Sequence, residues 1–177
     1  MKQIPILETH RLLLCPLREQ DIDWYCQMDS SPQVMRYVGR KGKVKTRRQV
    51  EDWIQRRLPQ KDGLGTWSVF LKKDRTFIGC LLLIQLENSP FIEIGYRLIE
   101  KYWGQGFATE GGIKVLEHAF LDLRLKEVVA VAIPENRASR RVMEKLGLRY
   151  VENTHYYQVE VALYRLSIET FLTIFES

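Results

Sequence analysis

Residues 103–108 combine the residue types of a phosphate-binding loop. The segment reads Trp-Gly-Gln-Gly-Phe-Ala and lies between a predicted strand and a predicted helix. Small residues let the backbone approach a ligand closely, and free N–H groups at the start of a helix attract phosphate or pyrophosphate. A simple turn has the same glycine spacing, so this segment alone leaves both interpretations open. A dinucleotide fingerprint needs glycine where Thr109 stands, and a Walker loop needs a G-K-S/T sequence that the chain lacks, so both are disfavoured.

Glu93 is a candidate for proton transfer. It lies in the otherwise apolar segment 91–94, where a buried carboxylate needs a partner or a function. A carboxylate there could accept the proton of a nucleophile. Strand alternation, however, places Phe91, Glu93 and Gly95 on one face, which also fits an ordinary exposed residue.

Composition favours a packed protein with an anionic ligand or partner. Of 177 residues, 45% are hydrophobic, and the formal net charge is +5. The three cysteines form no C-x-x-C pair and the three histidines have no metal-ligand spacing, so we expect no disulfide framework, no metal site and a reducing, cytoplasmic setting. Residues 1–8 lack the apolar run of a signal peptide, and no segment approaches the roughly 18 apolar residues of a membrane span. The sequence therefore predicts no membrane association.

The elements that must position these residues follow from periodicity. Strands are predicted at residues 7–17, 66–71, 76–86, 91–98, 128–133, 149–155 and 158–166. Helices are predicted before Pro32, around residues 50–57, at 108–122, and from Asn136 to an end marked by Gly147. Gly111 and Gly112 are unusual inside a helix; they indicate either close approach of cofactor or backbone, or a late helix start. The order predicts a single α+β domain over residues 1–177, with helices packed on a mixed sheet.

Several motifs together resemble the GNAT acetyltransferases, and especially their RimJ/RimL-like branch. In the family's phosphate pattern, Gln/Arg-x-x-Gly-x-Gly/Ala, Gly106 and Ala108 match and Trp103 replaces the first residue. The other matching motifs are Thr-His-Arg-Leu at 9–12, Glu-Ile-Gly-Tyr-Arg-Leu at 93–98, Tyr-Trp-Gly at 102–104, Asn-Arg-Ala-Ser at 136–139 and Glu-Lys-Leu-Gly at 144–147. The resemblance spans nearly the whole chain. It implies an acyl-CoA N-acyltransferase fold, with a mixed, mostly antiparallel sheet flanked by helices, and acetyl-CoA as cosubstrate.

The resemblance also implies a set of residues that bind acetyl-CoA. The strand whose backbone pairs with the pantetheine arm contributes Ile94, Gly95, Tyr96 and Leu98. The pyrophosphate loop and the start of its helix contribute Trp103, Gly104, Gln105, Gly106, Phe107, Ala108 and Thr109. Asn136 and Ser139 are implied near the thioester. For the remaining phosphate the candidates are Arg137, Arg140, Arg141 and Lys145, and we expect Arg141 among the binding residues.

The implied reaction is direct transfer of the acetyl group to an amine. Glu93 would accept the amine proton, and backbone N–H groups near Ile94 would stabilise the developing oxyanion. Many family members use a tyrosine as general acid at the position of Met143, which cannot donate a proton. Ser139 is therefore the candidate that protonates the thiolate, although a serine there is also common as a small packed residue. Tyr150 and Tyr156 remain alternative donors.

The acceptor and the partners stay open at this stage. A protein N-terminus, a ribosomal protein or a small-molecule amine would all serve, and either a monomer or a homodimer is compatible with the chain. Residues 36–48 hold seven Lys or Arg and no acidic residue, which would either steer acidic acceptors or form a solvated loop. Nucleic-acid binding is disfavoured because no recognised motif accompanies these charges. The alternative to an enzyme is a sensor that binds acyl-CoA without turnover.

Overall fold

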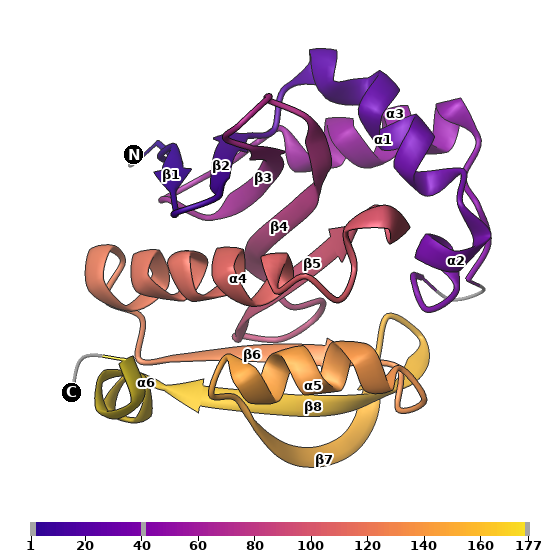
Figure 1. Ribbon diagram of the computed structural model, residues 1–177. Helices are drawn as coiled ribbons and strands as arrows, with labels where there is room; N and C mark the ends of the chain where they lie inside the picture. Colours follow the sequence, from indigo (N-terminus) through magenta and orange to yellow (C-terminus); the bar gives the residue numbers. More distant parts are fainter. Residues whose placement is uncertain (1–2, 40–41, 176–177) are drawn as a thin grey trace.

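The protein is built around one eight-stranded sheet with the strand order β1-β2-β3-β4-β5-β6-β8-β7. The computed structural model describes residues 3–39 and 42–175 (Figure 1). The strands are β1 (Leu7–Glu8), β2 (Leu12–Pro16), β3 (Gly65–Leu71), β4 (Phe77–Gln85), β5 (Ile92–Leu98), β6 (Glu127–Ala132), β7 (Arg149–Tyr156) and β8 (Val159–Ser167). This confirms the predicted mixed α+β sheet.

One junction in the sheet differs from all the others. Neighbouring strands pair antiparallel, except that β5 and β6 are parallel. These two strands are in register at a single pair, Glu93 and Val129. Beyond that pair they diverge, as Figure 1 shows. The sheet is therefore split along part of its middle.

Helices cover both faces of the sheet. On one face, called here the α3 face, lie α1 (Ile22–Asp29), α2 (Pro32–Met35) and α3 (Arg47–Arg57). On the other, the α4 face, lie α4 (Phe107–Glu117), which continues as a π-helical turn (His118–Asp122), α5 (Arg137–Lys145) and α6 (Ile168–Phe175). Short 3-10 turns occupy Glu19–Asp21 and Glu100–Tyr102. No helix within the described ranges is both long and apolar enough to cross a membrane.

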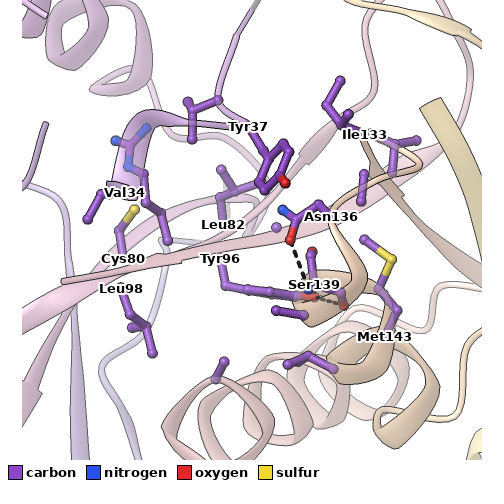
Figure 2. Close-up of a pocket in the computed structure, with 18 of the residues that line it drawn as sticks. Val34, Tyr37, Cys80, Leu82, Tyr96, Leu98, Ile133, Asn136, Ser139 and Met143 are labelled. Atoms are coloured by element: carbon purple, nitrogen blue, oxygen red, sulfur yellow. Dashed lines mark hydrogen bonds between the residues drawn. The ribbon is translucent and has the colours of Figure 1, made fainter. Parts of the chain in front are cut away.

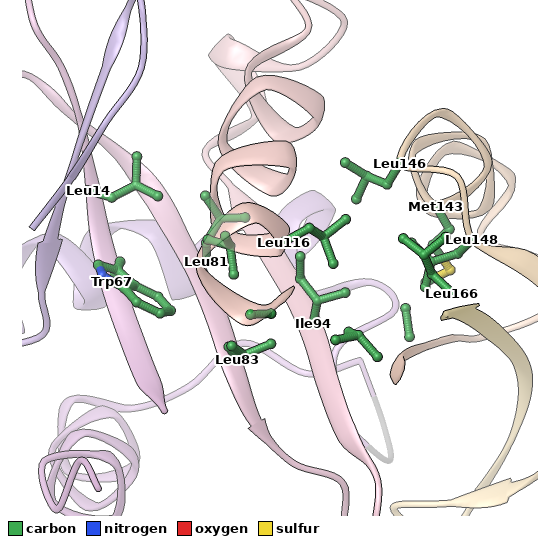
Figure 3. Close-up of a cluster of buried hydrophobic side chains, with 14 of the residues drawn as sticks. Leu14, Trp67, Leu81, Leu83, Ile94, Leu116, Met143, Leu146, Leu148 and Leu166 are labelled. Atoms are coloured by element: carbon green, nitrogen blue, oxygen red, sulfur yellow. The ribbon is translucent and has the colours of Figure 1, made fainter. Parts of the chain in front are cut away.

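Alternation along the strands assigns side chains to the two faces. Leu12 and Leu14 belong to the large core under α4 and α5, whereas Leu13 between them belongs to the core under α1 and α3. Figure 3 shows the large core, in which Leu81 and Ile94 of the sheet face Leu116 of α4. A one-residue change of register would exchange these two cores, so the hydrophobic pattern specifies which face each helix covers.

Sequence patterning located most elements but not their details. The predicted strand 7–17 is wrong as a single strand: the hydroxyl of Thr9 accepts a hydrogen bond from the Leu12 N–H at 2.9 Å, and the chain turns between β1 and β2. Two helices were not predicted, α2 and α6. The first helix, α1, stops before Pro32 as predicted, and Pro32 then starts α2, because proline is favoured at the first helical position after the Ser31 cap.

The two glycines inside α4 are explained by close packing. A Cβ on Gly111 would lie 2.6 Å from Leu81 Cδ1, and a Cβ on Gly112 would lie 2.8 Å from Leu146 Cδ2. Both glycines are buried within the helix, so a late helix start is wrong. Gly111 brings α4 onto β4, and Gly112 brings it onto the end of α5.

Gly112→Val should therefore destabilise the protein. Overpacking a close-packed contact typically costs about 1–3 kcal/mol of the free energy of unfolding. In a Leu146→Ala background the same substitution should cost less, because the methyl groups that it meets are gone. Urea denaturation of the four proteins of this double-mutant cycle measures the coupling. Additive effects of the two substitutions would show that the contact between residues 112 and 146 does not limit how closely α4 and α5 pack.

Candidate active site

A cleft of about 870 Å³ opens where β5 and β6 part. Its walls come from β5 and β6, from the loop before α4, from the first turn of α5, and from α2 with the residues after it. Figure 2 shows Tyr96 reaching from β5 toward Ser139 in α5. A cleft of this volume at the split of a sheet is the natural place for a ligand of cofactor size.

The glycine loop forms one wall of the cleft and has an open backbone. Gly104 has φ 70° and Gly106 has φ 81°, both in the left-handed region that favours glycine. Gly106 is the N-cap residue of α4. A Cβ on Gly104 would meet nothing within 4 Å, and one on Gly106 would meet only Arg11 Nη2 at 3.5 Å. These glycines are thus required by backbone conformation, and the space beside them is open to a ligand.

Arg11, which sequence analysis did not assign to the site, holds this loop in place. Its Nη1 donates a hydrogen bond to the Gln105 carbonyl oxygen at 3.1 Å, and its Nε donates to Glu110 Oε2 at 2.6 Å. The guanidinium also lies over the Phe107 ring, 4.3 Å from the centroid. Trp103 is anchored separately, because its Nε1 donates to the Leu98 carbonyl oxygen at 2.8 Å. Thr9 and Arg11 both bond Glu110 of α4, and no local sequence pattern predicts a contact over that separation.

Ser139 lies in the first turn of α5, beside the strand that carries Tyr96. The Tyr96 hydroxyl donates to the Ser139 carbonyl oxygen at 2.7 Å and lies 3.0 Å from its Oγ. Because the tyrosine proton is used by the carbonyl, the Ser139 hydroxyl is the donor in the 3.0 Å contact with the Tyr96 oxygen. Asn136 caps the helix, with its Oδ1 accepting from the Ser139 N–H at 3.2 Å. Burial raises the pKa of Tyr96 well above its ordinary value, so its hydroxyl stays protonated.

Glu93 is buried, with 7% of its surface exposed, at the point where β5 and β6 meet. Its carboxylate accepts a hydrogen bond from the Tyr157 hydroxyl. Burial raises the pKa of Glu93 to about 7, against the opposing effects of Tyr157 and Arg57. Such a carboxyl exchanges its proton near neutral pH, as a general base must.

Tyr157 is the second residue that sequence analysis missed. It lies in the tight turn between β7 and β8, where Tyr157 has φ 53° and Gln158 has φ 60°. Its backbone N–H donates to Glu87 Oε2 at 3.0 Å, which ties the turn to the end of β4. The turn thus delivers a tyrosine hydroxyl to Glu93 from 64 residues away. In the sequence, Tyr157 lies only in the two-residue gap between the predicted strands 149–155 and 158–166, which says nothing of its partner.

Most of the residues expected in the site line this cleft. They are Glu93, Ile94, Gly95, Tyr96, Leu98, Trp103, Gly104, Gly106, Phe107, Ala108, Thr109, Asn136 and Ser139. Two do not line it: the Gln105 side chain turns back to the Lys101 carbonyl oxygen, and Arg141 is exposed on α5. Tyr150 and Tyr156, the alternative donors, also lie outside its lining, and Tyr150 is 51% exposed.

The candidates for a further phosphate separate into two places. Lys145 lines the main cleft. Arg137, Arg140 and Arg141 surround a smaller hollow of about 230 Å³ together with Glu144. Arg140 is partly committed, because its Nε donates to the Tyr164 hydroxyl at 2.8 Å. The two remaining arginines of this hollow are exposed.

The basic segment 36–48 is not a solvated loop throughout. Arg47 and Arg48 begin α3, which is capped by Thr46, so that helix starts earlier than predicted. Lys45 is largely buried, and its Nζ contacts Asp29 Oδ2 at 2.9 Å. Arg36 and Lys45 both line the cleft. Arg40 and Lys41, which belong to the same predicted segment, lie outside the described residues.

Comparison with known proteins assigns the family. The family model for the acetyltransferase (GNAT) domain matches residues 11–149. The chain belongs to the GNAT acetyltransferase family. It is 35% identical over 162 residues to the FsC-acetyl coenzyme A-N(2)-transacetylase of Aspergillus fumigatus, covering 86% of this chain and 68% of that one. The protein is thus an acetyl-CoA-dependent acetyltransferase, and a non-catalytic sensor is not favoured.

Solved structures agree with this assignment. An acetyltransferase from Agrobacterium tumefaciens is 27% identical to this acetyltransferase, with a TM-score of 0.81 over 94% of this chain and 96% of that chain. A structure described as RimL, a ribosomal L7/L12 alpha-N-protein acetyltransferase in complex with coenzyme A, has a TM-score of 0.78 at 17% identity and covers 94% and 99% of the two chains. At that identity the second likeness shows the shared fold alone.

Tyr157→Phe should raise the pKa of Glu93 above about 7, because the hydrogen bond that stabilises the carboxylate is lost. A hydrogen bond to a charged group contributes roughly 1.5–3 kcal/mol, so the change should be measurable. The titration of the Glu93 carboxyl can be followed by carbon NMR and assigned with Glu93→Gln. Tyr156→Phe, the neighbouring substitution outside the cleft, should leave the titration unchanged. Equal pKa values in wild type and Tyr157→Phe would contradict the assigned contact.

Proposed function

We propose that this acetyltransferase moves the acetyl group directly from acetyl-CoA to a primary amine, with both substrates bound in one cleft. The observation that carries the proposal is that a carboxyl able to accept a proton and a hydroxyl able to donate one line the same cleft. Glu93 supplies a carboxyl with a pKa of about 7, and Ser139 supplies a hydroxyl held by Tyr96. Both line the same cleft as the glycine loop.

Glu93 acts as the general base in this proposal. An amine is mostly protonated near pH 7 and must lose a proton before or during attack on the thioester carbonyl. A carboxylate with a pKa close to that pH is well matched to this task. Tyr157 orients the carboxylate and keeps enough of it ionised. The proton passes to Glu93 directly or through a water molecule.

Ser139 protonates the departing thiolate of coenzyme A. Tyr96 holds the serine from the strand side and Asn136 holds it through the helix cap. Met143 lies in the same wall but has no proton to donate. Tyr96 is the reserve donor because its hydroxyl is 3.0 Å from Ser139 Oγ.

The glycine loop and the start of α4 would hold the pyrophosphate. Backbone N–H groups around Gly104 and Gly106 and the positive end of the helix dipole suit an anion. The open space beside both glycines fits that use. Lys145 at the cleft, or Arg137 and Arg141 at the adjoining hollow, would meet the third phosphate.

The acceptor belongs to the primary amines, as a protein N-terminus or a small molecule. We place the chain near the RimJ/RimL-like branch because of its Asn-x-x-Ser helix and its Trp-Gly loop. Among structures with the same fold are RimL, described as acting on a ribosomal protein, and a spermidine N-acetyltransferase of Vibrio cholerae. Their named acceptors share a free amine.

Acetyl-CoA should raise the melting temperature. A ligand that binds only the folded state increases the free energy of unfolding by about 2.7 kcal/mol at a hundredfold excess over Kd. Gly106→Val should reduce that rise, since a branched side chain fills the open space and resists φ 81°. Gly147→Val is the matched control: Gly147 has φ 86° but lies beyond the end of α5, outside the cleft lining. Calorimetric titration of the folded variants gives the affinities. Unchanged affinity in Gly106→Val would remove the loop from the site.

Glu93→Gln and Ser139→Ala should each lower kcat by roughly 10²–10⁴-fold while acetyl-CoA affinity changes little. In wild type, kcat should rise with pH through about 7, because the deprotonated Glu93 is the active form. Tyr150→Phe, an exposed tyrosine outside the cleft, serves as the control. Free-thiol release with a panel of amines measures turnover. Wild-type kcat in both variants would assign the proton transfers to other groups.

A further inference from the structure

We propose that the α3-face part of the cleft binds a carboxylate of the acceptor, so that the preferred substrates are primary amines carrying a carboxylate several atoms from the nitrogen. The inference rests on the proposed function and specifies its substrate class. It comes from the distribution of charge along the cleft walls, which differs between the two faces of β5.

β5 separates the cleft into two parts. Ile94, Tyr96 and Leu98 turn toward the α4 face, where Tyr96 meets Ser139 of α5. Glu93 and Arg97, on the alternate side of the strand, turn toward the α3 face. There Arg97 Nη2 lies 3.2 Å from Asp29 Oδ1 of α1. The glycine loop and Ser139 therefore belong to the α4 face, and Glu93 and Arg97 belong to the α3 face.

The α3-face part of the cleft carries an excess of positive charge around one aromatic ring. Lys45 Nζ lies 5.2 Å from the Trp53 centroid, and the guanidinium carbons of Arg97 and Arg57 lie 5.3 Å and 5.4 Å from it. All four side chains line the cleft. Close like charges of this kind are destabilising unless an anion joins them.

The anions already present do not balance these cations. Asp29 is fully buried and is shared by Lys45 and Arg97, so one carboxylate serves two cations. Arg57 and Arg36, which also line the cleft, make no ion pair within residues 3–39 and 42–175. Asp29 lies behind the lining; among the described residues that line the cleft the acid is Glu93, which is only partly ionised at neutral pH. The α3-face part of the cleft, called the chamber below, thus has two positive charges, Arg36 and Arg57, without an ion-pair partner among the described residues.

Arg97 itself is incompletely satisfied. Its side chain is 10% exposed; in the described part of the chain its Nε makes no hydrogen bond, and its Nη2 has only the 3.2 Å ion-pair contact with Asp29 Oδ1. Buried guanidinium groups normally find acceptors for their N–H groups, because an unsatisfied charged donor is costly. Burial, and after it repulsion from Arg97, also lowers the pKa of Lys45. Both observations indicate a chamber arranged for an incoming anion.

The spacing along β5 limits the length of the acceptor. Glu93 and Arg97 are four residues apart on one strand, which corresponds to about 13 Å between their backbones. Arg57 is close enough to Glu93 to lower its pKa, so the cations begin near the base. An amine at Glu93 and a carboxylate at Arg57 or Arg97 fit an ω-amino acid of about five to eight carbons. A carboxylate is favoured over a phosphate dianion, because Val34, Cys80 and Leu82 make the chamber partly apolar and a second charge would be costlier to bury.

A binding experiment tests the carboxylate site without requiring turnover. The protein saturated with coenzyme A is titrated calorimetrically with 6-acetamidohexanoate and with its neutral counterpart, 6-acetamidohexanamide. We expect the carboxylate to bind at least tenfold more tightly. Arg57→Gln combined with Arg36→Gln should reduce the ratio to about twofold or less, whereas Arg56→Gln, the exposed neighbour on α3, should preserve it. Arg97 is left intact because its removal would leave Asp29 unbalanced.

Equal affinities for the two ligands, including no binding of either, would overturn the carboxylate site. So would a ratio that persists in the Arg36 and Arg57 double variant. The coenzyme A titration in the same experiment tests the proposed function separately, because loss of that binding would contradict it. Turnover of 6-aminohexanoate and 6-aminohexanamide should show the same preference in kcat/KM. Equal kcat/KM for 6-aminohexanoate and 6-aminohexanamide would contradict the carboxylate preference while leaving the proposed acetyl transfer intact.

Discussion

The separation of β5 from β6 is the constraint on which the rest of the molecule depends. A parallel pair held at one position, Glu93 and Val129, leaves the following backbone of β5 and β6 unpaired on the sides that face each other, while β4 and β8 still pair with their other sides. Unpaired backbone N–H and C=O groups need partners. A ligand lying in the split can supply them, as an extended chain supplies them at the edge of a sheet. The cleft is thus a consequence of topology before any side chain is considered.

The two faces of β5 then divide the chemistry. One face joins the strand to α4 and α5, where the glycine loop and Ser139 lie. The other joins it to α1 and α3, where Glu93 and the cations around Trp53 lie. Because side chains alternate along a strand, five consecutive residues present groups on both sides, and in the proposed mechanism each side serves one substrate. A hydrogen bond joins Arg11 to Glu110 on the loop side, and the β7–β8 turn holds the Tyr157 hydroxyl on Glu93.

The sequence predicted what depends on local pattern. The glycine loop was recognisable because left-handed residues at a helix start need glycine, and Glu93 was recognisable because a carboxylate in an apolar strand requires a reason. Tyr157 and Arg11 were not placed in the site, since each acts on residues brought near by the fold: Tyr157 lies 64 residues from its partner and Arg11 lies 99 from Glu110. For Gly111 and Gly112 the sequence left close approach and a late helix start both open, because only the packed structure identifies Leu81 and Leu146 as the neighbours that require glycine.

The same burial that suits Glu93 to proton transfer lowers the stability of the protein. The ordinary pKa is 4.5 and the folded value is about 7, so between these pH values the unfolded chain has released the proton that the folded chain retains. The free energy of unfolding therefore falls as pH rises across this window, by about 3 kcal/mol at most. An apolar residue at the junction of β5 and β6 would avoid that loss. The carboxylate at the junction of β5 and β6 is thus a stability cost that packing does not explain. In the proposed mechanism, the same raised pKa makes its proton exchangeable at the pH of the reaction.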